Sequence, residues 1–151
     1  MTEIPTLPPN TIELGLGCHG EPGLRSISPI PSPEDLTKEM IALLSNTSDL
    51  DRGFIPFSST GKNEAILLVN SAGSTSDEVL ARFAELAIED LKRQGVEVVR
   101  MTLGPMVTSL KQSGFGFTVW RLPGVDEDGP LTRNEALECW DQKVVTAAWR
   151  Q

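Results

Sequence analysis

An apolar run, a helix signature and a second strand follow one another in the middle of the chain, and this order constrains the fold most. The unbroken run Ala65–Val69 is typical of a strand covered on both faces. Thr75 and Glu78 have the spacing of a helix capping box, and Gly95 ends the apolar periodicity that follows. We therefore predict a strand, a helix and a parallel second strand at residues 64–70, 76–94 and 96–102.

Further elements are predicted around this unit. Ser32 is suited to cap one helix, and Thr132 with Glu135 forms a second capping box. Together the pattern predicts an α/β fold: a two-layer unit with a mixed β-sheet. We expect an extended lead-in over 1–10 and a single domain over 11–151. The remaining predicted elements are strands over 11–18, 24–30 and 115–121 and helices over 33–45, 106–112 and 132–140.

The composition is that of a globular chain and weighs against two classes of partner. The 151 residues include 39% hydrophobic side chains, enough for a domain with a core. The net charge of −8 does not attract phosphate backbones or anionic lipids, so we expect neither nucleic acid nor membrane as a partner.

Localisation and metal binding follow from simpler signals. No apolar run approaches the roughly 20 residues of a membrane span, and the Pro-rich start lacks the features of a signal peptide. We therefore expect a cytoplasmic protein with reduced thiols at Cys18 and Cys139. The acidic run Asp126–Asp128 is expected to be a solvated turn, so neither a metal nor another cofactor is predicted.

The only histidine lies in a glycine-rich stretch, Gly15-Leu16-Gly17-Cys18-His19-Gly20-Glu21-Pro22-Gly23. A strand is expected to lead into this stretch and to deliver the imidazole on a loop, where glycines allow a ligand to approach the backbone closely. Histidine can move protons or attack a carbonyl near neutral pH. His19 is therefore a candidate catalytic residue. The alternative is a glycine-rich turn with an incidental histidine.

These motifs resemble those of the dihydroxyacetone kinase substrate-binding domain. The histidine stretch is similar to that family's Gly-x-Gly-x-His-Gly-Glu-Pro-Gly motif. Leu67–Thr75 resembles its Val-Asn-Asn-Leu-Gly loop, Gly104–Leu110 resembles its Gly-x-Phe-Met-Thr-Ser-Leu segment, and Ala147–Trp149 is similar to its Ala-x-Ala-Trp ending. The matches occur in order and cover nearly the whole chain, but they correspond only to the second half of the family's substrate-binding chain.

The resemblance implies a fold and a site. The family's second half is a two-layer α/β unit with a mixed sheet, and its matching histidine forms a covalent hemiaminal with dihydroxyacetone. The resemblance thus implies that His19 binds a small carbonyl compound. Because family motifs converge on strand ends, the implied substrate-binding residues are Gly17, Cys18, Gly20, Glu21, Asn70, Gly73, Thr108 and Ser109. The alternative is that Asn70 and Thr108 only brace their loops.

The chain also departs from the family pattern. The family's first half, with the loops around the substrate hydroxyls, is missing, and so is the nucleotide-binding domain or subunit. Ser71 and Ala72 replace the usual Asn and Leu, and Cys18 replaces an aliphatic residue. No Gly-x-x-x-x-Gly-Lys-Ser/Thr loop is present, so we expect this chain alone not to transfer phosphate from ATP. The chain is either a fragment or a free-standing half-domain with a changed function, and Met1 mildly favours the second.

Three functions remain compatible with the sequence. The first is a carbonyl-binding unit that contributes His19 to a site completed elsewhere. The second is a stand-alone lyase, isomerase or cyclase that uses His19 as a general acid or base. The third is a non-catalytic interaction subunit. We favour an enzymatic role over a purely structural one.

Loss of the family's first half also predicts association. A surface that is covered in the family would be exposed here, and exposed apolar patches usually mark interfaces. Phe115, Phe117 and Trp120 are candidates for such a patch, with core positions as the alternative. We therefore expect a homo-oligomer, such as a homodimer, or association with a missing partner half.

Overall fold

The computed structural model describes the chain in two compact units, Met1–Leu36 and Thr37–Gln151. Each unit has its own sheet. No helix in the described part of the chain is both long and apolar enough to cross a membrane. The described residues are 6–17, 19, 21–49, 51, 55–58, 61–110, 112–124, 127–146 and 149.

The first unit contains a two-stranded antiparallel sheet. β1 (Ile12–Leu14) pairs with β2 (Arg25–Ile27). The strands predicted over 11–18 and 24–30 are therefore present but shorter than expected. Gly15 has a φ of 75°, a left-handed conformation that turns the chain out of strand geometry directly after β1. The described residues of the histidine stretch consequently form a loop between two short strands.

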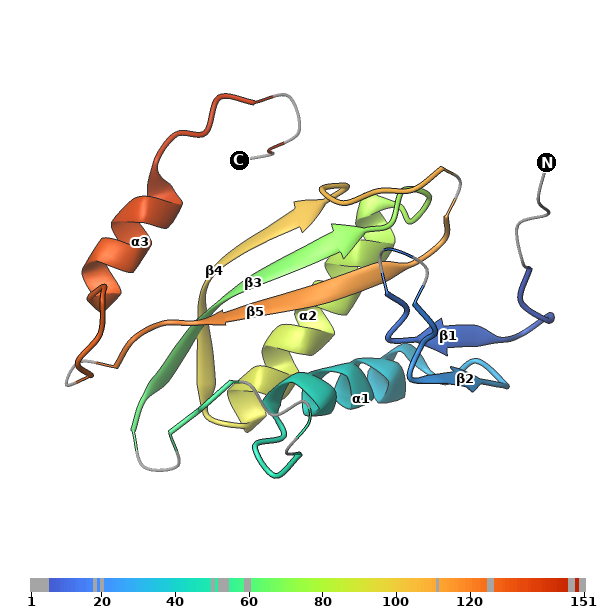
Figure 1. Ribbon diagram of the computed structural model, residues 1–151, viewed down its shortest axis with the longest axis horizontal. Helices are drawn as coiled ribbons and strands as arrows, with labels where there is room; N and C mark the ends of the chain where they lie inside the picture. The colour runs from blue at the N-terminus through green and yellow to red at the C-terminus, as the bar shows by residue number, and fades with distance from the viewer. Residues whose placement is uncertain are drawn as a thin grey trace. The chain divides into compact units, whose positions relative to one another are not determined.

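Beyond β2, the described residues form three helices and a three-stranded sheet. The elements are α1 (Pro33–Ser45), β3 (Asn63–Ser71), α2 (Asp77–Arg93), β4 (Val96–Gly104), β5 (Phe115–Arg121) and α3 (Arg133–Asp141). The strand order is β4–β3–β5, with β3 parallel to β4 and antiparallel to β5 (Figure 1). The predicted α/β fold with a mixed sheet is thus confirmed.

One predicted helix is wrong. The described residues of the segment 106–112 form no helix. The backbone N–H groups of Met106 and Val107 donate instead to the side chain of Asn70, and the Ser109 N–H donates to the Ala72 carbonyl. These hydrogen bonds satisfy backbone groups of the segment in a path that is not helical.

The helix starts were predicted with mixed success. The capping box of Thr132 and Glu135 is present at the start of α3. At the start of α2 the predicted cap is wrong, because Ser76 is the N-cap residue. The Thr75 hydroxyl instead donates to the Gly114 carbonyl and accepts from the Gly114 N–H, at 2.7 and 3.1 Å. A bond to a residue distant in sequence displaces the local cap.

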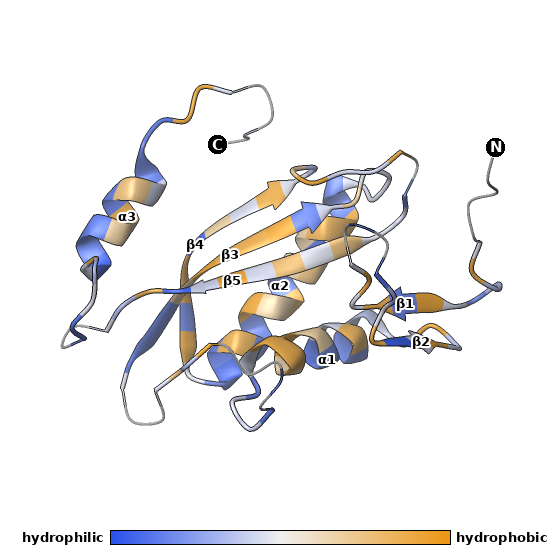
Figure 2. Cartoon of the chain, viewed as in Figure 1, coloured by the Kyte–Doolittle hydropathy of each residue, from blue (hydrophilic) through white to orange (hydrophobic). Residues whose placement is uncertain are grey.

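The main core lies between the sheet and α2, with α1 contributing Ile41. Figure 2 shows β3 as an apolar strand with more polar ends, in agreement with burial of its central residues. Phe115 and Phe117 pack against this core, so they occupy the core positions considered as the alternative to an exposed patch. Trp120 is 39% exposed. The buried members of the core are Ile41, Ala65, Leu67, Val69, Leu80, Ala84, Ala87, Leu91 and Val96.

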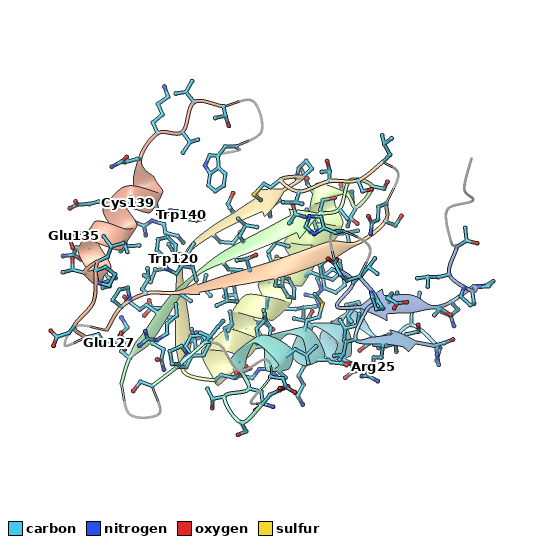
Figure 3. All side chains as sticks on the ribbon, viewed as in Figure 1. Arg25, Trp120, Glu127, Glu135, Cys139 and Trp140 are labelled. Carbon is cyan, nitrogen blue, oxygen red and sulfur yellow. The ribbon has the colours of Figure 1, made fainter. Side chains whose placement is uncertain are left out.

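A smaller apolar cluster attaches α3 to the sheet. Ile66 of β3 is buried with Leu122 and Ala136. Ile66 lies between Ala65 and Leu67 of the main core, so it belongs to the opposite face of the strand. Aromatic rings extend this cluster: Trp120 and Trp140 face each other with centroids 6.3 Å apart (Figure 3).

Two ion pairs hold the ends of α3. Arg133 at its start pairs with Glu64, and Asp141 at its end pairs with Arg100 through two bonds of 2.9 Å. The Arg133 guanidinium is the main reason why the pKa of the Glu64 carboxyl lies below its ordinary value. Arg100 lowers the pKa of Asp141 in the same way. The helix is therefore fixed by charge at both ends and by apolar contact between them.

Acid should release α3. Because the folded-state pKa values are lowered, both pairs stabilise the docked helix above the ordinary values of 4.5 for Glu64 and 3.8 for Asp141, and this stabilisation is lost as the pH falls towards the lowered values. The chain contains three tryptophans, all in or beside this cluster, so their emission reports on α3. We expect a change in tryptophan emission below about pH 4.5.

Variants separate this effect from general acid unfolding. Glu64→Gln should produce part of the acid-induced emission change already at pH 7, because Glu64 is only 11% exposed and loses its charge. Glu138→Gln removes an exposed acid of the same helix and should follow the unmodified chain. Identical titrations of all three proteins would contradict the role of these pairs.

Candidate functional site

The candidate histidine lies on a loop closed by backbone hydrogen bonds. Leu24 N–H donates to the Leu14 carbonyl at 2.7 Å, where the loop leaves and rejoins the two strands. Within the loop, Gly17 N–H donates to the Glu21 carbonyl at 3.2 Å. This second bond forms a tight turn that brings His19 close to Glu21.

His19 and Glu21 form the chemically distinctive pair of this loop. His19 Nδ1 lies 3.5 Å from Glu21 Oε1, and the His19 backbone N–H donates to Glu21 Oε2 at 3.0 Å. Hydrogen bonds from the backbone N–H groups of Glu21 itself and of His19 hold the pKa of the Glu21 carboxyl below its ordinary value. The imidazole is 84% exposed. A carboxylate at Nδ1 favours the tautomer that leaves a lone pair on Nε2.

Gly17 allows this pair to form. A Cβ atom at this position would lie 2.1 Å from Glu21 Oε2 and 2.7 Å from Glu21 Cβ. Any larger residue would therefore displace the carboxylate that contacts His19. The sequence singled out Gly17 as a substrate-binding residue. In the structure, a glycine is needed at this position because a side chain would collide with Glu21.

Glu13 supports the same loop and was not predicted. Its two carboxylate oxygens accept from the Gly23 N–H at 3.2 Å and from the Ser26 hydroxyl at 3.1 Å. A single acid in a short strand carries no signal of this role in the sequence. Cys18 and Gly20, the other predicted residues of this loop, lie outside the described residues.

In the second unit, Asn70 uses its side chain to hold the backbone after β4. Asn70 Oδ1 accepts from the N–H groups of Met106 and Val107 at 2.8 and 2.7 Å, and Nδ2 donates to the Val107 carbonyl at 2.8 Å. Asn70 thus makes the contacts expected of a loop brace, the alternative considered for it from the sequence.

The loops after β3 and β4 are joined by further bonds. Ser109 N–H donates to the Ala72 carbonyl at 2.8 Å, and Ser74 N–H donates to the Gln112 carbonyl at 3.0 Å. Gly73 lies between these bonds with a φ of 134°, and a Cβ atom there would come within 2.6 Å of the Ser109 carbonyl oxygen. Gly73 therefore permits close contact between two backbones.

Thr108 and Ser109 are exposed, and neither hydroxyl forms a hydrogen bond with another described residue. The structure thus places Asn70 at the carboxyl end of β3, and Gly73, Thr108 and Ser109 on the joined loops that follow the parallel strands β3 and β4. A cleft shared by these residues with His19 stays a prediction.

Several titratable side chains described outside this loop form ion pairs and local hydrogen bonds. Among the described residues, no group of three or more His, Cys, Asp or Glu side chains is arranged to hold a metal ion. Glu127, from the predicted acidic turn, pairs with Arg121 and accepts from the Gly124 N–H at 2.8 Å. Cys139 is a free, exposed thiol on α3 (Figure 3).

Substitution of Gly73 tests the close contact of the two loops. Gly73→Ala should destabilise the fold more than Gly95→Ala, although both replace a glycine with positive φ. Gly95 has open space around its Cβ position, so its cost is conformational, about 1–2 kcal/mol. Gly73→Ala adds a backbone clash of about 1–3 kcal/mol. Denaturant unfolding of both variants measures the difference, and equal losses would contradict the contact.

The chain is similar to a family of domains and to several named proteins, among them dihydroxyacetone kinases. The model of the Dak1 domain matches residues 2–148. Dihydroxyacetone kinase of Komagataella pastoris is 33% identical over 138 residues, which cover 91% of this chain and 21% of that protein. Triokinase/FMN cyclase of Mus musculus is 34% identical over 138 residues, with the same two coverages.

Shorter relatives and solved structures agree with this similarity. The dihydroxyacetone-binding subunit DhaK of the PTS-dependent dihydroxyacetone kinase 1 of Listeria innocua is 34% identical over 111 residues, which cover 74% of this chain and 31% of that subunit. The dihydroxyacetone kinase operon co-activator Dha-DhaQ matches with a TM-score of 0.63 and 26% identity, over 81% of this chain and 34% of that chain.

The chain spans about a fifth to a third of the length of these relatives. The Dak1 match nevertheless covers almost every residue of this chain, from the segment before β1 to the segment after α3. On this evidence, the chain belongs to the Dak1 domain family.

Proposed function

We propose that the chain is a carbonyl-binding unit related to dihydroxyacetone kinase, in which His19 binds a short hydroxyketone through Nε2. The observation that carries the proposal is the contact of His19 Nδ1 with Glu21 Oε1 at 3.5 Å. In a neutral imidazole this contact selects the tautomer with the proton on Nδ1, which leaves the lone pair on Nε2, the nitrogen that can attack a carbonyl carbon. The imidazole is 84% exposed, so a ligand can reach it from solvent.

The covalent step balances without a cofactor. The Nε2 lone pair forms a bond to the carbonyl carbon, and the π electron pair of the C=O bond moves to oxygen. The oxygen takes a proton from water, while the Nδ1 proton leaves to the Glu21 carboxylate or to water. The product is a neutral hemiaminal. Glu21 would therefore act twice, by orienting the imidazole and by accepting its proton.

The relatives support the substrate class. One of them is named as a dihydroxyacetone-binding subunit, and others are named dihydroxyacetone kinases. Because the chain spans only part of their length, we propose ketone binding for it and not their whole reaction. A short hydroxyketone offers one electrophilic carbon for His19 and hydroxyl groups for neighbouring polar side chains.

The adduct can be observed directly. Dihydroxyacetone labelled with ¹³C at its carbonyl carbon should show a new tetrahedral carbon resonance with the unmodified chain, and intact-protein mass spectrometry should show a matching mass increase. His19→Ala should abolish both signals, because the chain has no other histidine. Glu21→Gln should reduce adduct formation by about tenfold, since it removes the charged partner of Nδ1.

Glu138→Gln serves as the control, because it removes an exposed carboxylate far along the sequence from the loop. It should form the adduct as the unmodified chain does. An adduct that persists in His19→Ala would overturn the role of His19. Equal adduct formation in Glu21→Gln and in Glu138→Gln would overturn the role of Glu21.

A further inference from the structure

We infer that Asn70 is a positioning residue, which fixes the loop over 105–110 so that the hydroxyls of Thr108 and Ser109 can bind the hydroxyl groups of a small polyol or hydroxyketone. The inference rests on the proposed function for the class of ligand. It assigns Asn70 a role one step away from the ligand, in contrast to the direct binding suggested by the sequence.

The hydrogen bonds of Asn70 support the indirect role. The Oδ1 atom has two lone pairs, and both are used by the N–H groups of Met106 and Val107. The Nδ2 group donates to the Val107 carbonyl at 2.8 Å. The hydrogen bonds define the orientation of the Asn70 side-chain amide. A flipped amide would place Nδ2, a donor, against the N–H groups of Met106 and Val107, which are also donors. Asn70 Oδ1 therefore has no acceptor capacity left for a ligand.

Thr108 is held on both sides. On one side, Asn70 fixes the backbone of Val107. On the other side, the Ser109 N–H donates to the Ala72 carbonyl at 2.8 Å. Gly73 makes this close approach of the two backbones possible, because a Cβ atom there would clash with the Ser109 carbonyl oxygen. We call these bonds from Asn70 and Ala72 to residues 106–109 the loop brace. The brace fixes the path of the backbone through Thr108.

The braced loop combines fixed backbone with free hydroxyls. Thr108 and Ser109 are exposed, and within the described part of the chain neither hydroxyl forms a hydrogen bond. A hydroxyl can both donate and accept, which matches the hydroxyl groups of a small polyol. The loop also follows β4, at the carboxyl end of a parallel strand pair, where α/β sheets commonly bind ligands. Preorganised groups bind with a lower entropic cost.

The chain provides a matched control at the other end of the same strand. Asn63 Oδ1 accepts from the Ser58 N–H, and Asn63 Nδ2 donates to the Ser58 carbonyl, both at 2.8 Å. Asn63 therefore braces a loop by the same chemistry as Asn70, at the amino end of β3. Replacing either Asn63 or Asn70 by Ala should lower the stability of the fold. Only replacement of Asn70 should lower the affinity for the ligand.

The experiment combines amide hydrogen exchange with binding of dihydroxyacetone by the full chain. In Asn70→Ala, exchange of the Met106 and Val107 amides should accelerate at least about tenfold, and affinity should fall about tenfold. Asn63→Ala should change neither. Asn70→Asp keeps the acceptor oxygen and should restore most of the amide protection. Thr108→Val removes one hydroxyl and should lower affinity while the two amides stay protected.

Each result tests a separate part of the inference. Unchanged exchange in Asn70→Ala overturns the brace. Equal losses of affinity in Asn70→Ala and Asn63→Ala overturn the specific positioning role, and full affinity in Thr108→Val overturns the role of its hydroxyl. If the unmodified chain binds no dihydroxyacetone, the proposed function and the ligand part of this inference fail together, whereas exchange still decides the brace.

Discussion

The second unit depends on β3, the central strand of its sheet. β3 forms hydrogen bonds to β4 on one side and to β5 on the other. One of its faces contributes Ala65, Leu67 and Val69 to the main core, and its other face contributes Ile66 to the cluster under α3. Each of these residues is almost completely buried, so a polar or shortened side chain here would affect several elements at once.

The two ends of β3 show how backbone groups in loops are satisfied when regular structure ends. Beyond the sheet, N–H and C=O groups lose their ladder partners and need others. A side-chain amide carries both a donor and an acceptor, so one Asn can replace a backbone partner for a neighbouring loop. Asn63 does this for Ser58, and Asn70 does it for Met106 and Val107. The fixed paths of both loops thus follow from β3.

The sequence predicted elements well where local signals determine them. The apolar run Ala65–Val69 and the box of Thr132 with Glu135 depend on near neighbours, and both predictions are confirmed. The predictions failed where distant residues compete. Thr75 bonds to Gly114 and does not cap α2, and bonds to Asn70 and Ala72 hold residues 106–109 in a path other than the expected helix. Such long-range bonds leave no periodic pattern in a sequence.

The candidate site was predicted in the same uneven way. A motif singled out His19 and Glu21, and the structure shows the two side chains in contact, while their role in binding stays a prediction. The reason for Gly17, a close approach of the Glu21 side chain, is visible only in three dimensions, and Glu13 gave no signal at all. A motif identifies which residues occur together, whereas packing and hydrogen bonding determine what each of them does.

The brace at Asn70 has a consequence for how the sequence of this loop can vary. All three of its hydrogen bonds end on main-chain atoms of residues 106 and 107. The path of the loop is therefore largely independent of which side chains the loop carries. Substitutions at the exposed positions Val107, Thr108 and Ser109 can alter shape and polarity at the strand ends without dismantling their support. Under the function proposed above, an arrangement of this kind would let ligand preference change in single steps while the scaffold keeps its stability.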